Sequence, residues 1–333
     1  MSHEIAKKAA MLLFSTSRQP CVNIHFHGGE PTLLSDEWYH DVVRHIKQLA
    51  VKYKKTVTLS IQTNATLLDR ERILSFKHLG IDFSVSCDGP PYLNDTMRQE
   101  GTLVDKALRL LHELRIPTGI NVVVHQLNCH HTRDIMDYFK SLEQKSVQFV
   151  FLEAQGRGLN LAPLQGEDVF QCLRQTFDYM LDTKCIVVEK RVRRMINRYK
   201  LGRLKGVYNC VEFECGAGRW FAAVDYTGRI SPCDTHMEQW ALGNVMELID
   251  EAKAWHIISE FHKKNASHTK CFCCEAKKIC TFGCTMNSHN RQQSMEEECK
   301  GTRLFWEYLQ NNNKSVDEVF GILEESRSNK YIL

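Results

Sequence analysis

Hydrophobic and polar positions follow two alternating patterns over the first two thirds of the chain. Short, nearly continuous apolar runs predict strands that are covered on both faces. These runs are Val22–His27, Thr56–Thr63, Asp82–Cys87, Gly119–Val124 and Val147–Leu152. Amphipathic stretches between them predict helices. These stretches are Asp36–Lys54, Asp69–Leu79, Leu103–Leu114 and Thr132–Ser141. Gly80 follows the second stretch, where a glycine that ends a helix belongs. The repeat predicts an α/β fold with a parallel sheet.

The beginning of the chain departs from this repeat. It opens on a predicted helix at about residues 3–14, although a parallel α/β layer normally begins with a strand. One strand and the loop after it would then be missing from the start of the sheet.

A longer helical pattern runs from Gln165 to about Leu201 and carries five basic side chains on one face. They are Arg191, Arg193, Arg194, Arg198 and Lys200. We favour a solvated surface as the interpretation of this face, with an acidic partner as the alternative.

The pattern changes after Tyr208. Arg219–Asp225 and Arg229–Cys233 flank Tyr226-Thr227-Gly228, which predicts a β-hairpin whose glycine supplies the positive φ. Loop rich in cysteine, glycine and charge follows, and then a final helix around Arg303–Asn311. We therefore expect two domains, residues 1–204 and 205–333.

Charge and hydropathy exclude several classes of partner. The chain has 43 Lys and Arg against 40 Asp and Glu, a net charge of +3, so it gives no reason to expect nucleic acid or a membrane surface. No apolar run is long enough to span a bilayer, and the first residues lack the pattern of a secretory signal. A cytoplasmic location is the resulting expectation.

Fourteen cysteines in such a chain are not expected to form disulfides. Five of them are scattered over the first 209 residues, and we expect them to be small buried hydrophobes. They are Cys21, Cys87, Cys129, Cys172 and Cys185. The other nine fall between Cys210 and Cys299, a density that burial does not explain.

The dense region has the spacing of metal ligands, Cys271-x2-Cys274-x5-Cys280-x3-Cys284. With Cys273 left out, eight cysteines remain in the region, enough for two sets of four. The other four are Cys210, Cys215, Cys233 and Cys299. Thiolates suit zinc or iron–sulfur clusters. Zinc ribbons usually have two separate Cys-x2-Cys pairs, and only one is present, so iron–sulfur is favoured over zinc. Eight buried cysteines without a metal are the least favoured interpretation.

The cysteine pattern resembles the SPASM domain of radical S-adenosylmethionine (SAM) enzymes, which modify peptides and proteins. The pattern is Cys-x12-Gly-x4-Cys, then Cys-x2-Cys-x5-Cys-x3-Cys, then Cys. Earlier segments resemble the same family, and most closely its anaerobic sulfatase-maturing group. They are His27-Gly28-Gly29-Glu30-Pro31, similar to the GGEP segment, Gln62-Thr63-Asn64-Ala65-Thr66-Leu67-Leu68, similar to QTNGTLL, and Ser84-Val85-Ser86-Cys87-Asp88-Gly89-Pro90 with Arg98. Pro232-Cys233-Asp234 and Leu242-Gly243-Asn244 also resemble that group.

The resemblance implies a partial (β/α)6 TIM-like barrel, here missing its first strand, followed by a SPASM domain. SAM would lie across the carboxyl ends of the strands, with the GGEP segment holding its amino group. The implied binding residues are Gly28, Gly29, Glu30, Pro31, Gln62, Thr63, Asn64, Ser86, Asp88 and Arg98. Two auxiliary 4Fe–4S clusters are also implied. One would be held by Cys210, Cys215, Cys233 and Cys284, and the other by Cys271, Cys274, Cys280 and Cys299.

Three further residues are candidates for the site. By resemblance, Asp234 is the catalytic proton acceptor from the substrate; the alternative is a carboxylate that only hydrogen-bonds the loop around Cys233. His27 stands at a strand end, near SAM or as a satisfied rim histidine. Glu153, near the end of the last predicted strand, is a pocket residue or a surface residue.

One family motif is absent from the sequence. SAM cleavage requires a Cys-x3-Cys-x2-Cys loop after the first barrel strand, and Cys21 stands alone before Gly28. Two explanations compete. Met1 is an internal methionine and the loop is encoded upstream, which we favour because the other motifs are intact, or the protein has lost its SAM-cleaving cluster.

The leading functional prediction is a radical SAM/SPASM maturase of a peptide or protein side chain, served by an electron donor such as a flavodoxin or ferredoxin. A 5′-deoxyadenosyl radical would abstract hydrogen, and oxidation to formylglycine or cross-linking would follow. The segment 152–158 departs from sulfatase-maturing enzymes, which leaves the substrate open. The alternatives are a non-catalytic, cluster-bearing peptide-binding or electron-transfer module and a zinc-bound structural domain.

Overall fold

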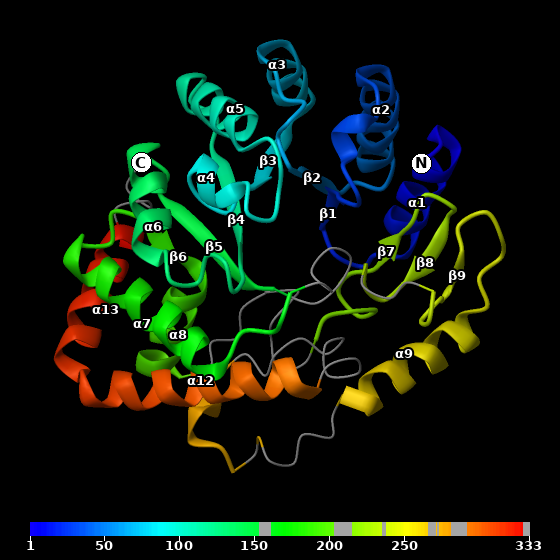
Figure 1. Ribbon diagram of the computed structural model, residues 1–333. Helices are drawn as coiled ribbons and strands as arrows, with labels where there is room; N and C mark the ends of the chain where they lie inside the picture. The colour runs from blue at the N-terminus through cyan, green and yellow to red at the C-terminus, as the bar shows by residue number, and fades with distance from the viewer. Residues whose placement is uncertain are drawn as a thin grey trace. The chain divides into compact units, whose positions relative to one another are not determined.

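A six-stranded sheet with strand order β1-β2-β3-β4-β5-β6 forms the framework of the computed structural model (Figure 1). The structure describes residues 1–152, 161–202, 215–234, 238–265, 271, 273–280 and 292–328. Neighbours in the sheet are also neighbours in the sequence, which is the order of a barrel wall and not of a doubly wound sheet. Strand pairs β1–β2, β4–β5 and β5–β6 are parallel. The predicted α/β fold with a parallel sheet is therefore confirmed.

The strands of this sheet are β1 Cys21–Phe26, β2 Thr56–Thr63, β3 Ile81–Ser86, β4 Thr118–Val124, β5 Ser146–Phe151 and β6 Val188–Glu189. The helices among them are α1 His3–Thr16, η1 Pro31–Leu33, α2 Asp36–Lys52, α3 Arg70–Leu79, α4 Pro91–Asn94, α5 Gly101–Glu113, α6 Thr132–Ser141, α7 Gly166–Asp182 and α8 Lys190–Leu201. The later part contains β7 Ala223–Val224, β8 Arg229–Ser231, β9 Gly243–Asn244, α9 Glu251–Asn265, η3 Glu275–Lys278, α12 Gln292–Asn311 and α13 Asn313–Ser328.

Most of the predicted elements are found close to their predicted limits. β2 and α6 have the predicted bounds, and Gly80 ends α3 in the left-handed conformation, with φ 77°. The predicted hairpin is present as the antiparallel pair β7–β8, and β9 extends it to three strands. The single helix expected from Gln165 to Leu201 is wrong, because β6 divides it into α7 and α8. The missing first strand stays a prediction.

The chain packs as two compact units, residues 1–84 with 208–268 and residues 85–207 with 269–333. The predicted domain boundary between residues 204 and 205 lies outside the described residues and stays a prediction.

The first unit has an aromatic core beneath its helices. Phe26 of β1 contacts Trp38 and Tyr39 of α2, and Tyr39 contacts Phe76 of α3. Tyr39 and Phe76 are fully buried, so this cluster fixes α2 and α3 against the beginning of the sheet.

The hairpin segment of the same unit packs against α9. The His262 ring lies 2.9 Å from the carbonyl oxygen of Ala217, and Trp240 contacts Phe261 edge to face. Gly218 has a positive φ of 71°, and a Cβ there would lie 2.9 Å from Ile258, so glycine is needed at this close approach.

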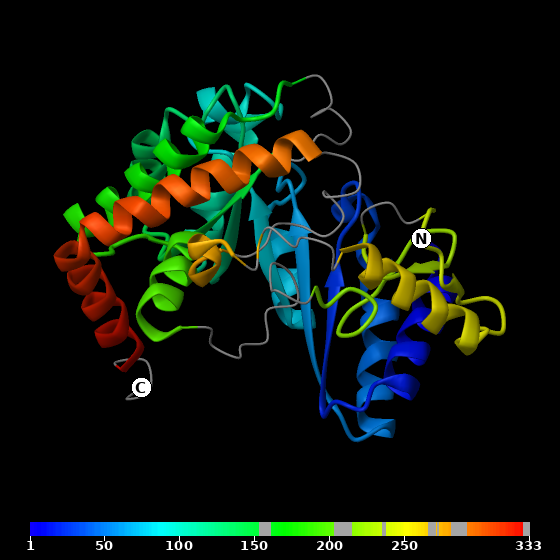
Figure 2. The same ribbon diagram turned by 90° about the horizontal axis from the view of Figure 1, so that it is seen from below.

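In the second unit, α12 lies along α7 (Figure 2). The two helices approach most closely at a pair of glycines. A Cβ on Gly301 of α12 would lie 2.5 Å from Val169 of α7 and 2.7 Å from the carbonyl oxygen of Gly166. Further along, Tyr308 donates a hydrogen bond of 2.6 Å to Asp178. The position of α12 therefore depends on the absence of a side chain at Gly301.

We expect Gly301→Ala to destabilise the protein by about 1–3 kcal/mol, because the added methyl overlaps backbone and Val169 atoms that have little room to shift. Chemical denaturation of the folded chain measures the loss. Gly321→Ala in α13 is the control. A Cβ at Gly321 meets nothing within 4 Å, so alanine there should be neutral or slightly stabilising. Equal effects of the two substitutions would contradict the close approach.

Among the helices that the structure describes, none combines the length and the apolar character that crossing a membrane requires. The cytoplasmic location stays a prediction.

Candidate functional site

The segment after β1 is anchored to the end of β2 by one carboxylate. Glu30 accepts hydrogen bonds from the Thr63 hydroxyl and the Asn64 backbone N–H, both at 2.8 Å, and from the Thr32 backbone N–H at 2.9 Å. The neighbouring Gly28 has φ 131°, a conformation that only glycine adopts easily. Two motifs that lie far apart in the sequence, GGEP and QTNATLL, thus meet at one edge of the sheet.

Space is open above this loop. A Cβ added to Gly28 or Gly29 would meet nothing within 4 Å, and both residues are exposed. Pro31 is buried, and its carbonyl oxygen accepts a hydrogen bond of 2.8 Å from Tyr39. The loop is therefore fixed from below and accessible from above, which suits the binding of a small ligand by the backbone.

The turn after β2 departs from the family motif at Ala65, where the motif has glycine. Ala65 has φ 63° and is almost fully buried. A non-glycine residue in this region costs about 1–2 kcal/mol. The turn is held by the Asn64 side chain, which accepts from the Thr66 N–H and hydroxyl. The strained turn thus keeps the backbone beside the Glu30 anchor in one conformation. Gln62 is half-buried at the end of the same strand.

A histidine and an aspartate from distant parts of the first unit face each other. His27 Nδ1 lies 3.6 Å from Asp234 Oδ2, and the Cys233 thiol donates to Asp234 Oδ1 at 3.2 Å. Both partners are about half exposed, at 46% and 57%. His25, two residues before His27, hydrogen-bonds Ser60, and burial together with the His27 charge lowers its pKa, with Asp234 opposing. The HGGEP loop and the Pro-Cys-Asp segment therefore share one site.

In the second unit, Asp88 is buried at the end of β3 and organises the loops around it. Its side chain is 1% exposed and accepts from Arg98 Nε at 2.7 Å and the Val123 N–H at 2.8 Å. Its own N–H donates to Asn94 at 3.1 Å. Asp88 and Arg98, predicted to bind SAM, thus form a buried ion pair, and the half-buried Ser86 precedes them on the same strand.

Four of the predicted cluster ligands lie together in the second unit. Burial raises the pKa of the Cys299 thiol to about 12, and the nearby Cys280 and Cys271 add to it. Burial also raises the pKa of Cys271, with Cys274 adding to it. All four side chains are partly buried, whereas Cys273 is exposed. The Cys299 thiol thus lies near those of Cys280 and Cys271, and the Cys271 thiol lies near that of Cys274.

Basic side chains of α8 hold this cysteine region. Arg198 donates to the carbonyl oxygen of Cys280 at 2.8 Å, Arg191 pairs with Glu298 beside Cys299, and Lys200 pairs with Asp317 of α13. The Arg191 side chain is only 12% exposed. The expectation of a solvated basic face is therefore wrong for Arg191 and Arg198, whereas Lys200 is exposed as expected. Their partners are about 80 to 120 residues away, a distance that helical periodicity does not reveal.

The remaining predicted site residues are only partly covered by the described residues. Cys210 and Cys284 of the first ligand set, and Glu153, lie outside the described residues; Cys215 and Cys233 are both partly buried in the first unit. The scattered cysteines Cys87, Cys129 and Cys172 are buried as expected, but Cys21 is exposed at the first position of β1.

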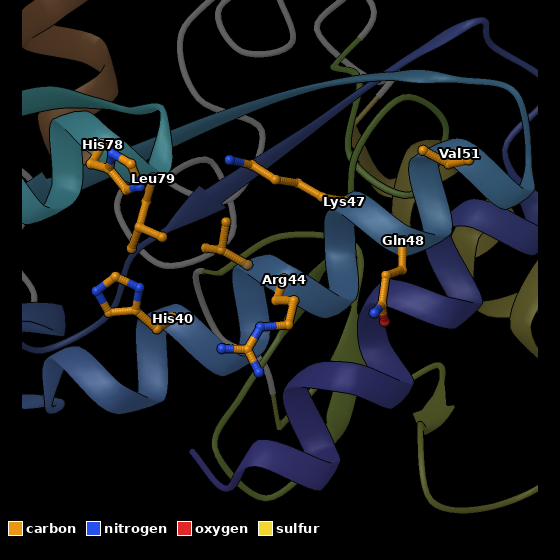
Figure 3. Close-up of a pocket in the computed structure, with 8 residues that line it drawn as sticks. His40, Arg44, Lys47, Gln48, Val51, His78 and Leu79 are labelled. Atoms are coloured by element: carbon orange, nitrogen blue, oxygen red, sulfur yellow. The ribbon is translucent and has the colours of Figure 1, made fainter.

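A surface groove lies between α2 and α3 of the first unit (Figure 3). It is lined by His40, Val43, Arg44, Lys47, Gln48, Val51, His78 and Leu79. None of these residues belongs to the two loops directly after β1 and β2, which contain His27, Glu30 and Asn64. The groove is therefore separate from the site formed by those loops. Its charged side chains are all basic.

The chain is similar to several known proteins in sequence and fold. Residues 2–139 match the Radical SAM superfamily. The chain is 24% identical to the cysteine-type anaerobic sulfatase-maturating enzyme of Clostridium perfringens, over 92% of this chain and 86% of that one. It is 22% identical to the serine-type enzyme of Bacteroides thetaiotaomicron, over 93% and 80%. The solved structure of native anSMEcpe with bound AdoMet and Cp18Cys peptide has the same fold, with TM-score 0.81, 21% identity and coverage of 97% and 92%.

Proposed function

We propose that the chain is a radical SAM enzyme that oxidises a peptide or protein side chain, because residues 2–139 match the Radical SAM superfamily and the chain is similar to anaerobic sulfatase-maturating enzymes. The reaction class is the conversion of a cysteine or serine side chain to formylglycine. The two relatives with these names support this choice, because they are similar over most of the length of the chain. An electron donor such as a flavodoxin or ferredoxin would complete the system.

The loop after β1 is the proposed SAM site. The fit rests on two observations: open space above Gly28 and Gly29, and a Glu30 carboxylate that fixes the backbone below. The remaining proposed binding residues of this unit are Pro31, Gln62, Thr63 and Asn64, and binding of SAM by Ser86, Asp88 and Arg98 of the second unit stays a prediction. Bound SAM, once cleaved by a reductant, would supply the radical that removes a hydrogen atom from the substrate.

The cysteine sets are the proposed sites of two auxiliary 4Fe–4S clusters. Cys271, Cys274, Cys280 and Cys299 supply the donor type that such a group takes, and each of these thiols lies near at least one other in the second unit. Cys210, Cys215, Cys233 and Cys284 would form the other set. Loss of the thiol proton on ligation would free Asp234 from its bond to Cys233.

The approach of His27 to Asp234 carries the proposal. It joins the loop proposed for SAM to the carboxylate proposed as proton acceptor, within one compact unit. Asp234 is half exposed, so a substrate can reach it, and His27 faces its Oδ2 atom. We propose that Asp234 accepts the substrate proton and that His27 orients its carboxylate.

We expect Asp234→Asn to lower product formation by about 10²–10⁴-fold, because the amide keeps the shape of the carboxylate but cannot accept a proton at neutral pH. The chain, expressed with the upstream segment that would encode the Cys-x3-Cys-x2-Cys loop, is reconstituted and incubated with SAM, a reductant and a sulfatase-derived peptide containing cysteine. Formylglycine in the peptide and 5′-deoxyadenosine are then measured together. Formation of 5′-deoxyadenosine should persist in the variant, since hydrogen removal precedes the proton transfer.

Glu238→Gln is the matched control, because Glu238 is 89% exposed and pairs only with Arg229 in the described contacts. It should keep full product formation. Normal formylglycine yield from Asp234→Asn would leave Asp234 a loop-bonding residue. No upstream Cys-x3-Cys-x2-Cys segment in frame, together with no 5′-deoxyadenosine from the reconstituted chain, would instead favour the non-catalytic, cluster-bearing module.

A further inference from the structure

A second group of metal-binding side chains lies in the second unit, outside both cysteine sets. Cys129 and His130 stand in the loop between β4 and α6, and Asp168 stands in the first turn of α7. One donor atom from each of the three lies within 4.8 Å of the other two. The two helices are neighbours in the fold (Figure 1). We propose that Cys129, His130 and Asp168 form a zinc site.

The donor distances fit a shared ion better than a direct bond. His130 Nε2 lies 3.5 Å from Asp168 Oδ1. That exceeds the 2.7–3.2 Å of a good hydrogen bond, whereas the adjacent His131 reaches Asp134 at 3.0 Å. With bonds of about 2.0–2.3 Å, two ligands of a tetrahedral zinc ion stand about 3.5 Å apart. The separation between His130 and Asp168 already has this value.

The loop that carries the first two ligands is held in one conformation. Asn128 accepts from the His125 N–H at 2.8 Å and donates to the Val123 carbonyl at 2.9 Å. The Cys129 N–H donates to the His125 carbonyl at 2.9 Å. His125 and Asn128 are fully buried, so this polar turn is part of the core. The Cys129 sulfur is therefore fixed at the base of the site.

The third ligand is oriented by its role at the helix terminus. Asp168 Oδ2 accepts from the Gln165 N–H at 3.2 Å, as the second half of a capping box. Its other oxygen, Oδ1, faces His130. A carboxylate with one oxygen held by the protein and the other available is the usual arrangement of an oriented ligand.

The residue types select the metal. A thiolate excludes Mg²⁺ and Ca²⁺, which take oxygen ligands, and one sulfur, one nitrogen and one oxygen suit zinc. Cys129 is 1% exposed, whereas the His130 side chain is 65% exposed, so the ion would have a dry side and a wet side. A water molecule would take the fourth position on the wet side. The ion would tie the loop after β4 to the start of α7.

The test uses the full chain with its iron–sulfur clusters loaded. Zinc is added, the chain is washed with a moderate chelator, and bound zinc is counted and probed at the zinc X-ray absorption edge. We expect about one zinc per chain with one sulfur at about 2.3 Å and nitrogen or oxygen neighbours at about 2.0–2.2 Å. Loss of a residue that only orients a metal ligand weakens metal binding by about 10–100-fold. His130→Ala removes a ligand itself and should weaken zinc binding by more than this. Asp168→Asn should act in the same direction.

The matched controls are His131→Ala and Asp134→Asn, a neighbouring pair outside the group. Both should keep the zinc, and iron content should be unchanged in all four variants, which separates this site from the clusters. Because His130 is exposed, His130→Ala is not expected to unfold the chain. A parent chain without zinc, equal zinc in His130→Ala and His131→Ala, or an absorption spectrum with several sulfur neighbours would overturn the proposal.

Discussion

A Cys299→Ala chain is expected to reconstitute with about four fewer irons than the parent, which should take up about eight. Cys299 stands on α12, and its thiol lies near those of Cys271 and Cys280. Alanine removes the sulfur without adding a replacement ligand, so one iron of the proposed cluster loses its protein ligand and the cluster is held less tightly. Iron and sulfide are counted after anaerobic reconstitution, and formylglycine formation should fall in parallel.

Cys273→Ala is the control for this result. Cys273 lies between two of the ligands but is exposed and belongs to neither predicted set. It should keep the iron content of the parent. Undiminished iron in Cys299→Ala would show that the four-thiol set is not a cluster site, and zinc uptake without sulfide would favour a structural zinc domain.

Asp88→Asn should lower the free energy of unfolding by about 2–4 kcal/mol. The buried carboxylate accepts from Arg98 and from the Val123 N–H, and an amide can present only one oxygen to these two donors. One donor then faces an NH2 group and loses its partner inside the protein. Arg98 is 30% exposed and can turn to water, so the amide oxygen should stay with the Val123 N–H and the bond to Arg98 carries most of the loss. Denaturant unfolding under anaerobic conditions measures it.

Asp82→Asn is the comparison for this variant, since Asp82 is an exposed residue of the same strand. It should change stability by less than about 0.5 kcal/mol. If the two substitutions gave equal effects, the ion pair of Asp88 with Arg98 would make no specific contribution to the free energy of unfolding.

The sheet was predictable because its strands are apolar and its helices have clear polar faces. β6 was not, because its second residue, Glu189, is charged in the sequence but fully buried in the fold. Glu189 accepts from the N–H groups of Phe149, Arg191 and Val192 and so caps α8. Burial raises its pKa, and these N–H bonds oppose the rise. A carboxylate used in this way has the same sequence pattern as a surface residue.

The parts of the candidate site also differ in how well the sequence predicts them. Short cysteine spacings predicted which thiols are neighbours, since nearby residues converge whatever the rest of the fold does. Contacts between distant segments had no such signal. The His27–Asp234 approach and the Arg191–Glu298 pair depend on how whole elements dock. The Cys129, His130 and Asp168 group was missed for the same reason, because Cys129 alone has the pattern of a buried apolar residue.

The close contact of α7 with α12 has a consequence for the order of assembly. Gly166 and Glu297, which are hydrogen-bonded partners at this contact, are 131 residues apart. A ribosome releases the chain from its amino end, so α7 and the first three thiols of the set emerge well before Cys299. Until α12 docks on α7, the three have no fourth partner. Iron delivered during synthesis would therefore meet an incomplete set, and loading of the proposed cluster has to wait until α12 docks on α7.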